Sequence, residues 1–239
     1  MKSTLFPSNN RGHADFGWLK ARYSFSFSSY FNEQNLHFGA LRVLNDDIVA
    51  PASGFGTHPH NNMEIITIPL RGKLRHKDST GHEGEIQSGE VQVMSAGSGI
   101  THSEFNASQN EELNLLQIWI FPEKQNVQPA YNQHKYDPQD LQNKWFTVVG
   151  PNGSDNKLTI NQNAFLRLAK FEANQEFSLK PTSNEFGQYL FVIDGELQTP
   201  EFSLKKRDAL GIVNSEEFTF KTLQDAFLLC IEVPMIEHP

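Results

Sequence analysis

Residues 54–70 read GFGTHPHNNMEIITIPL. Two glycines introduce two histidines that are spaced i, i+2, and a run rich in Ile and Thr follows until Arg71-Gly72 marks a turn. Runs of β-branched residues of this length favour a β-strand. Because residues i and i+2 of a strand point to the same face, we expect His58 and His60 to project together. This stretch predicts a strand-rich fold that presents two histidines on one face.

A second stretch has the same design: residues 97–104 read GSGITHSE. Its His102 and Glu104 are also spaced i, i+2 after a Gly-x-Gly sequence, so they would share one face of a strand. If the two strands lie close across a barrel, three imidazoles and one carboxylate converge on one point. That set of donors suits a divalent transition metal. The alternative is that His58 and His60 are ordinary loop histidines beside a proline.

Most of the remaining sequence alternates with period two, and amphipathic helical stretches are scarce. Apolar runs broken at short intervals by Gly, Asn or Asp indicate a β-sandwich or a barrel. We expect strands at residues 23–28, 64–70, 91–94, 113–121, 146–149, 164–171, 189–193, 218–220 and 226–233. Residues 137–144 predict one short helix, with Pro138 at a favoured early position. The predicted fold class is all-β.

The two halves of the chain resemble each other weakly. Residues 68–74 (IPLRGKL) and residues 191–197 (FVIDGEL) both place an x-Gly-x-Leu turn at the end of a strand, and each is followed by a second turn. Between the halves, residues 122–143 are rich in Gln, Asn and Pro, which is typical of a linker. The pattern indicates a duplicated β-barrel. Convergent hairpin chemistry is the alternative explanation.

The composition excludes several classes of function. A hydrophobic content of 38% in 239 residues is enough for a folded core. The net charge of −8 argues against a nucleic-acid binder, because such proteins carry a basic face. The N-terminus lacks the apolar segment of a signal peptide and no apolar stretch is long enough to span a membrane, so we expect a soluble, cytoplasmic protein. Phosphate-binding, dinucleotide-binding and serine-hydrolase motifs are absent.

The two histidine-bearing stretches resemble the two cupin motifs of the pirin family. The similarity to pirin sequences is carried by residues 56–67, 94–106, 75–79, 25–27 and 41–43. It is strong over residues 10–125 and looser toward the C-terminus. It implies a bicupin fold, with two antiparallel jelly-roll barrels in one chain. The expected division is an N-terminal barrel with the metal at 1–128, a linker at 129–145 and a C-terminal barrel without metal ligands at 146–239.

The resemblance also implies a set of ligands. Pirin-like proteins hold one metal in the N-terminal barrel, and the matching residues here are His58, His60, His102 and Glu104. In other cupins a Glu four residues after the second histidine is a ligand, and Glu64 has that position. Pirin-like proteins take their carboxylate from the second motif, so we expect Glu104 to ligate and Glu64 to support a ligating histidine. The alternative for Glu64 is an outward-facing strand residue. The other histidines are expected to be structural or surface residues: His13, His37, His76, His82, His134 and His238.

The activity implied by the resemblance is that of a quercetin 2,3-dioxygenase, which opens the central ring of a flavonol with O₂ and releases carbon monoxide. The expected metal is Fe(II), although three imidazoles and a carboxylate also accept Zn, Mn, Co, Ni or Cu. Glu104 is the expected catalytic base toward the 3-hydroxyl of the substrate. The partners expected are O₂ and a small flavonol-like aromatic, without direct nucleic-acid or membrane contact.

Two other functions stay open. The same ligands would serve a non-catalytic, iron-binding redox sensor that acts through protein partners. They would also serve a cupin enzyme with a different small-molecule substrate. We expect a monomer, because a bicupin is already an internal pair of barrels.

Overall fold

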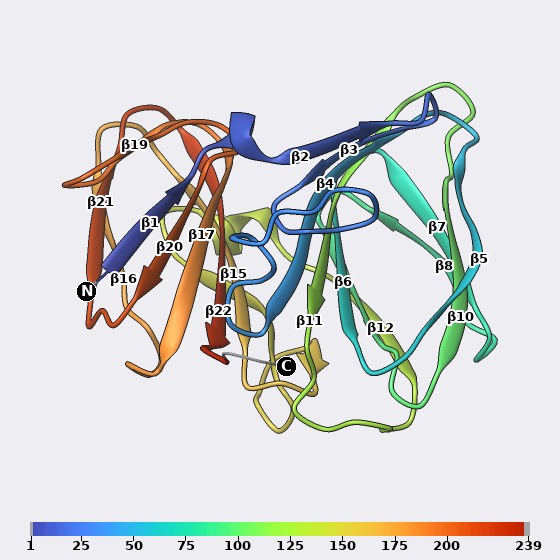
Figure 1. Cartoon of the computed structure of the whole chain (residues 1–239). Coiled ribbons are helices and arrows are strands. Elements are labelled where there is room, and N and C mark those ends of the chain that lie inside the picture. Colours follow the sequence, from blue (N-terminus) through green and yellow to red (C-terminus); the bar gives the residue numbers. More distant parts are fainter. Residues whose placement is uncertain (1, 237–239) are drawn as a thin grey trace.

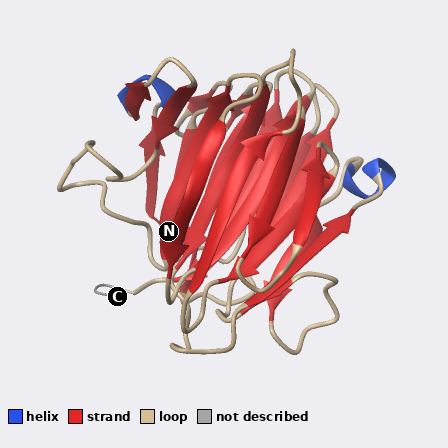
Figure 2. Ribbon diagram, turned by 90° about the vertical axis from the view of Figure 1, so that its right-hand side faces the viewer, coloured by secondary structure: helices blue, strands red, loops and turns tan. Residues whose placement is uncertain are grey.

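The computed structural model describes residues 2–236 and has two β-barrels side by side (Figure 1). Each barrel is built from one seven-stranded and one four-stranded sheet. Within the described residues, helical structure is confined to two short 3-10 turns, Ser8–Asn10 and Pro138–Leu141 (Figure 2). The prediction of an all-β chain with two largely antiparallel barrels is confirmed.

The N-terminal barrel contains both histidine-bearing strands. Its large sheet has the spatial order β12 (Ala130–Lys135), β9 (Glu90–Ser95), β6 (Glu64–Arg71), β11 (Leu113–Ile120), β4 (Leu41–Val49), β3 (Leu19–Tyr23) and β2 (Gly12–Asp15). Its small sheet has the order β5 (Gly54–His60), β10 (Ile100–Asn106), β7 (Lys73–Asp78) and β8 (Glu83–Gln87). The strands predicted at 64–70, 91–94 and 113–121 are confirmed.

The C-terminal barrel repeats this plan. Its large sheet has the order β1 (Lys2–Phe6), β20 (Ala209–Val213), β17 (Phe186–Asp194), β22 (Ala226–Pro234), β15 (Phe165–Phe171), β13 (Phe146–Pro151) and β14 (Thr159–Ile160). Its small sheet has the order β16 (Glu176–Leu179), β21 (Phe218–Thr222), β18 (Leu197–Gln198) and β19 (Ser203–Leu204). The turns at Gly72 and Gly195, where the two halves were expected to correspond, both have a positive φ, at 81° and 93°. The strand orders and these turns agree with a duplicated barrel.

The strand expected at residues 23–28 lies earlier, at β3. Beyond β3 the chain leaves the sheet, because the Ser26 hydroxyl donates to the carbonyl oxygen of Asn32 and accepts from its N–H. Serine side chains that bond to nearby backbone in this way compete with regular strand pairing. The alternation of Phe and Ser in this stretch therefore misplaced the strand.

The short helix expected at residues 137–144 is only a 3-10 turn at Pro138–Leu141. The side chain of Asp137 caps it by accepting from the backbone N–H of Gln139 at 2.9 Å. A single turn without a longer apolar face has nothing to extend it into an α-helix.

The edge strands do not follow the expected domain boundaries. β1 pairs with β20, so residues 2–6 complete a sheet of the C-terminal barrel, and Figure 1 shows this blue strand beside the orange ones. β12 pairs with β9, so residues 130–135 of the expected linker at 129–145 extend a sheet of the N-terminal barrel. The division into 1–128, 129–145 and 146–239 stays a prediction, and these two strands cross its boundaries.

Strand alternation decides which side chains lie between the barrels. On β6, Ile66 and Ile68 pack into an apolar core shared by both barrels, and this core includes Leu229 and Ile231 of β22. Thr67 has the opposite orientation and lies inside the N-terminal barrel, near Glu104. Burial of each large aliphatic side chain stabilises a fold by about 1.5–3 kcal/mol, so this shared core holds the barrels together. None of the helices in the described residues is long and apolar enough to cross a membrane.

Candidate metal centre

The three histidines predicted as ligands lie on two neighbouring antiparallel strands, β5 and β10. In their register, His58 lies directly opposite His102. Gly54 permits this close pairing, because a Cβ at that position would overlap the carbonyl oxygen of Glu104. The alternation along β5 adds His60 to the same face. Local strand geometry therefore brings three imidazoles together.

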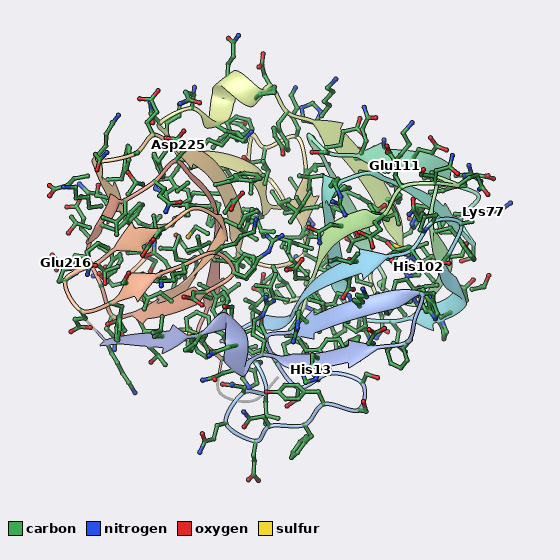
Figure 3. The ribbon with its side chains drawn as sticks, turned by 90° about the horizontal axis from the view of Figure 1, so that it is seen from above. His13, Lys77, His102, Glu111, Glu216 and Asp225 are labelled. Carbon is green, nitrogen blue, oxygen red and sulfur yellow. The ribbon has the colours of Figure 1, made fainter. Side chains whose placement is uncertain are left out.

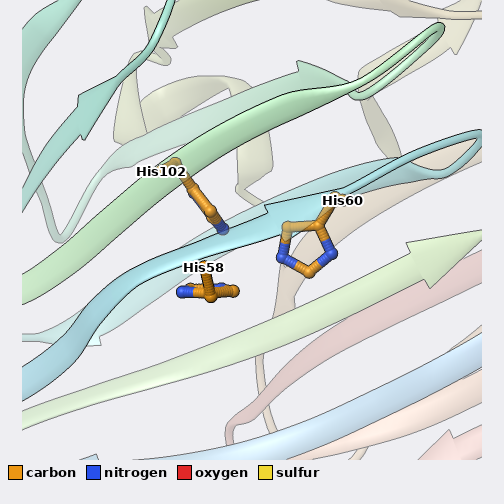
Figure 4. A group of neighbouring side chains, drawn as sticks. All are labelled: His58, His60 and His102. Carbon is orange, nitrogen blue, oxygen red and sulfur yellow. The ribbon is translucent and has the colours of Figure 1, made fainter.

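The three rings face a common space. Their centroids are separated by 4.4 Å between His58 and His102, and by 4.8 Å between His60 and each of the other two. One nitrogen from each ring lies within 4.8 Å of the other two. Figure 4 shows the rings turned toward one another from the two strands. Only small movements would let these nitrogens share one ion at bond lengths of about 2.0–2.1 Å.

Hydrogen bonding determines which nitrogen of His58 is free. Its Nδ1 lies 2.8 Å from the carbonyl oxygen of Gly56. A carbonyl can only accept, so Nδ1 carries the proton and Nε2 presents a lone pair. His102 is 1% exposed, and neither of its ring nitrogens has a hydrogen-bond partner among residues 2–236.

The surroundings keep two of these imidazoles neutral. Burial lowers the pKa of His102 to about 3, with a further contribution from His58 and His60. Burial and the neighbouring His58 lower the pKa of His60 to about 4. A neutral imidazole has the lone pair that a metal requires. His60 and His102 can therefore ligate at neutral pH without first losing protons.

Glu104 lies two residues beyond His102, after a β-bulge that shifts the register of β10 against β5. Its Oε2 accepts from Nε2 of Gln117 at 2.9 Å, and Oε1 of the same Gln117 accepts from the Thr67 hydroxyl at 2.8 Å. Burial raises the pKa of Glu104 to about 7, and its hydrogen bonds to Thr67 and Gln117 oppose that rise. A nearby divalent cation would favour the carboxylate form.

The predicted ligands fall into two overlapping groups rather than one. His58, His60 and His102 form the first, while Glu104 forms a second with His102 and His76, again with donor atoms within 4.8 Å. His102 belongs to both groups. The structure therefore gathers the three histidines as expected and places the Glu104 carboxylate beside His102.

His76 was expected to be a structural or surface residue. The structure places it next to the site, where it is completely buried. It lies on β7 directly opposite Glu104. Its Nε2 is 3.0 Å from Oδ2 of Asp78, whereas its Nδ1 has no partner among the described residues. The sequence signal was the His-x-Asp spacing in residues 75–79, since i and i+2 share a face of a strand.

The expected role of Glu64 is wrong. Its carboxylate accepts from the Ser95 hydroxyl at 2.6 Å and from Asn161 at 3.2 Å, not from a histidine. The reason is strand alternation on β6, where Glu64 shares a face with Ile66 and points toward the C-terminal barrel. Glu64 is also not an outward-facing residue, because it is fully buried.

A cavity of about 350 Å³ opens onto the site. Its walls include the aromatic side chains of Phe16, Trp18, Tyr23, Phe27, Phe55 and Trp119. Its polar lining consists of Ser28, Asn45, Asp47, His58, His60, Glu104 and Gln117. The volume falls within the range of about 300–1,000 Å³ that is usual for small-molecule sites. Apart from the ligand candidates, these lining residues were not identified from the sequence.

Histidines elsewhere do not join the site. His13 and His134 are exposed, and Figure 3 shows His13 apart from His102, although both lie in the N-terminal barrel. His82 stacks on Tyr131, with ring centroids 3.7 Å apart, and His37 bonds to the carbonyl of Gly39. His238 lies outside the described residues. Among residues 2–236, both groups of potential metal donors lie in the N-terminal barrel.

The donor atoms fit a divalent metal. A buried ring such as that of His102, with both nitrogens unpartnered, is rare in folded proteins unless it binds something. Three imidazoles beside one carboxyl are typical of sites for transition metals. These residues would hold an ion beside the aromatic cavity.

Comparisons with known proteins give matches over nearly the whole chain. The model of the family described as Pirin matches residues 7–120, and that described as the quercetinase C-terminal cupin domain matches residues 147–233. A protein of Escherichia coli K12 named quercetin 2,3-dioxygenase is 37% identical over 233 residues, which cover 97% of this chain and 99% of that one. A pirin-like protein of Caulobacter vibrioides is 37% identical over 95% of this chain and 97% of its own length.

Solved structures show the same architecture. The crystal structure of the bacterial pirin YhhW from Escherichia coli in complex with nickel(II) superimposes with a TM-score of 0.92. It has 33% sequence identity and covers 98% of this chain and 100% of that one. That protein binds a divalent metal.

Proposed function

The chain belongs to the pirin family, and from this premise we propose that it is a metal-dependent dioxygenase that opens the central ring of a flavonol-like aromatic with O₂. The observation that carries the proposal is the convergence of three imidazoles at the edge of an aromatic-lined cavity. The relative named quercetin 2,3-dioxygenase supports this choice of substrate class.

His58, His60, His102 and Glu104 are the residues proposed to hold the metal, with Fe(II) as the native ion. The nickel(II) complex of the related pirin supports a divalent ion in this fold. A bound ion supplies Lewis acidity that makes a substrate hydroxyl easier to deprotonate. His58 contributes through Nε2, because its Nδ1 is bonded to the carbonyl of Gly56.

Glu104 is proposed to take the proton from the hydroxyl of the substrate. Its Oε2 accepts from Gln117 at 2.9 Å, and its Oε1 accepts only a longer bond from the Thr67 hydroxyl at 3.4 Å, so Oε1 is the oxygen proposed to receive that proton. A pKa raised by burial to about 7 suits a group that both accepts and releases a proton near neutral pH. Gln117 therefore orients the carboxyl while Glu104 moves the proton.

The cavity is proposed to bind the flat rings of the substrate and to exclude water. Trp119 packs edge-on against both His60 and Phe27, with ring centroids 4.9 and 5.3 Å apart. This packing fixes an aromatic wall next to the donor atoms. A flat aromatic ligand would find apolar contacts there and its oxygens would face the polar lining.

A non-catalytic metal sensor is the second candidate function. A sensor needs a redox-active metal but no cavity of substrate size beside it. The cavity of about 350 Å³ at the histidines therefore favours the enzyme.

Oxygen uptake tests the proposal. We expect the protein, purified without oxygen and loaded with Fe(II), to consume O₂ when quercetin is added. We also expect Glu104→Ala to abolish this consumption. His13→Ala, at an exposed histidine, is the matched control and should consume O₂ at the rate of the unchanged protein. Metal-loaded protein that takes up no oxygen with quercetin would instead favour the sensor.

A further inference from the structure

Two consecutive carboxyls on β4, Asp46 and Asp47, have opposite surroundings. Asp46 faces the C-terminal barrel, where its Oδ2 is 2.9 Å from Nε of Arg207 and its Oδ1 accepts from Asn114 at 2.8 Å. Asp47 faces the interior of the N-terminal barrel and lines the cavity beside the histidines. It is 4% exposed, and its Oδ1 has no hydrogen-bond partner within residues 2–236. One carboxyl is fully paired, and its neighbour is buried with an unused polar atom.

The cross-strand neighbours of Asp47 cannot satisfy it. In the sheet it lies between Ala21 of β3 and Leu115 of β11, whose side chains form no hydrogen bonds. Arg11 lies near enough to act on Asp47 only through its charge. An unsatisfied buried carboxyl costs stability, so its retention at the wall of a cavity needs a reason.

The same surroundings determine the protonation state. Burial, together with the charges of Asp46 and Glu104, raises the pKa of Asp47 to about 8 against the opposing effect of Arg11. In the metal-free protein at neutral pH, the side chain is therefore a carboxylic acid. In that form it has one O–H donor as well as an acceptor.

The side chains that line the cavity limit which groups can accept a hydrogen bond from Asp47. Many of them are aromatic, and none of them forms a hydrogen bond with the Asp47 side chain, so a bound ligand can supply the acceptor for Asp47. A ring carbonyl or a phenolic oxygen of a flat aromatic compound is such an acceptor. A site built to bond an oxygen rejects an analogue that lacks it, because the buried polar group is then left unpaired.

We propose that Asp47 is a specificity-determining residue of this cavity, where its carboxylic acid donates a hydrogen bond to an acceptor oxygen of an aromatic ligand. The inference rests on the proposed function for the class of ligand, and it adds which residue selects for oxygen-bearing members of that class. It also explains why two adjacent aspartates differ so sharply in their partners.

Ligand binding without turnover tests this assignment. Quenching of tryptophan fluorescence reports binding, because Trp18 and Trp119 line the cavity. The full chain, loaded with nickel(II) and kept free of oxygen, is titrated with quercetin and with 2-phenylnaphthalene. The second compound has the ring shape of a flavonol without its oxygens. Both titrations are repeated on metal-free protein.

Three variants separate the roles. Asp47→Leu keeps the shape of the side chain without its polar atoms, and Asp47→Asn keeps a donor. Asp46→Asn is the matched control on the other face of β4. We expect Asp47→Leu to raise the Kd of quercetin at least about 10-fold and that of 2-phenylnaphthalene less than 2-fold, in line with one lost hydrogen bond. Asp47→Asn and Asp46→Asn should stay within about 3-fold of the unchanged protein.

Several results would overturn the proposal. An equal rise in the Kd of both compounds in Asp47→Leu would show that only the shape of the side chain matters. If Asp47→Asn raises the Kd of quercetin as much as Asp47→Leu does, the side chain does not act as a hydrogen-bond donor. If Asp47→Leu does not fold, the same comparison is made with Asp47→Ala. Oxygen uptake is measured separately, so a protein that binds quercetin through Asp47 but consumes no O₂ would refute only the dioxygenase. Uptake together with unchanged binding by Asp47→Leu would refute only the role of Asp47.

Discussion

Where the N-terminal barrel pairs His58 with His102 across β5 and β10, the C-terminal barrel pairs Phe177 with Phe220 across β16 and β21. The strand orders of the two small sheets correspond. The equivalent bonds from Ala107 N–H to the Lys73 carbonyl and from Leu223 N–H to the Glu196 carbonyl place Phe218 where His102 lies and Phe220 where Glu104 lies. Phe177 stacks on Phe171 with ring centroids 3.7 Å apart. Phe220 belongs to an apolar cluster that fills the barrel. One scaffold thus holds potential metal donors at one end of the molecule and a packed core at the other.

The comparison extends along each strand. Glu104 of β10 corresponds to Phe220 of β21, whereas Thr222, two residues further on, corresponds to Asn106, and all four side chains are buried. The Thr222 hydroxyl donates to the carbonyl of Glu172 at 2.6 Å, so its only polar atom is satisfied. Glu104 retains a raised pKa and an oxygen that faces the cavity. We infer that the buried polar groups of the site destabilise the N-terminal barrel, whereas the packed core of the C-terminal barrel stabilises the fold.

The largest expected effect comes from making β10 resemble β21. His102→Phe should reduce the metal content from about one ion per chain to almost none. It should reduce oxygen uptake with quercetin at least about 100-fold, because even the partners of ligating histidines contribute about 10–100-fold. Elemental analysis and an oxygen electrode measure these effects. Metal content that is unchanged in this variant would contradict the assignment of the site to β5 and β10.

The reverse test creates a cavity in the core of the C-terminal barrel. Phe220→Ala should lower the free energy of unfolding by about 3–5 kcal/mol, because removal of a buried phenylalanine leaves a cavity. The metal content per folded chain should not change. Denaturant unfolding gives the stability, and the same elemental analysis gives the metal. A loss of metal at full folding would mean that the two barrels do not divide their roles.

The next effect depends on pH. The pKa of Glu104 is about 7 in the folded protein, above the ordinary value of 4.5, so the folded state binds this proton more tightly than the unfolded chain. Its contribution to stability is therefore complete below pH 4.5 and is lost as the pH rises through 7. In metal-free protein at pH 8, Glu104→Gln should raise the free energy of unfolding by about 3 kcal/mol, since each unit of pKa corresponds to about 1.36 kcal/mol.

The matched variant for this test is Thr222→Val in the other barrel. It removes a satisfied hydrogen bond and should cost about 1 kcal/mol at every pH. Urea unfolding from pH 4 to pH 9 compares both variants with the unchanged protein. Equal stability of Glu104→Gln and the unchanged protein at pH 8 would show that the buried carboxyl carries no such cost.

The smallest expected effect concerns the contact between the barrels. Arg207→Ala should lower the free energy of unfolding by about 1–3 kcal/mol, because the partly buried Asp46 then loses its charged partner. The exposed pair of Arg71 and Glu112 is the control, and Arg71→Ala should cost less than about 0.5 kcal/mol. Thermal unfolding measures both. Equal losses of unfolding free energy in the two variants would mean that the ion pair of Arg207 and Asp46 stabilises the protein no more than a surface ion pair.

The sequence was most informative where a local rule was sufficient. The i, i+2 spacing places His58 beside His60 in any strand, and the two Gly-x-Gly stretches indicated that His102 would lie near them. These predictions need only the alternation of a strand and one pairing. The all-β class followed from the same alternation over the whole chain.

The sequence was least informative where contacts depend on register. Glu64 follows a turn, and its face is determined by the pairing of β6 with β9, which spacing alone cannot give. The same is true of His76, which meets Glu104 only because β7 pairs with β10. The insertion of β1 into the distant sheet of the C-terminal barrel joins residues about 200 positions apart, and a five-residue strand carries no signal for such a partner.

The most direct test of the division between the barrels is a crystal structure of the metal-loaded chain with data collected at the absorption edge of the metal. The account predicts one anomalous peak, bonded to His58, His60, His102 and Glu104 at about 2.0–2.2 Å, and none inside the C-terminal barrel. A peak bonded to a different set of residues, or a peak in the C-terminal barrel, would contradict it.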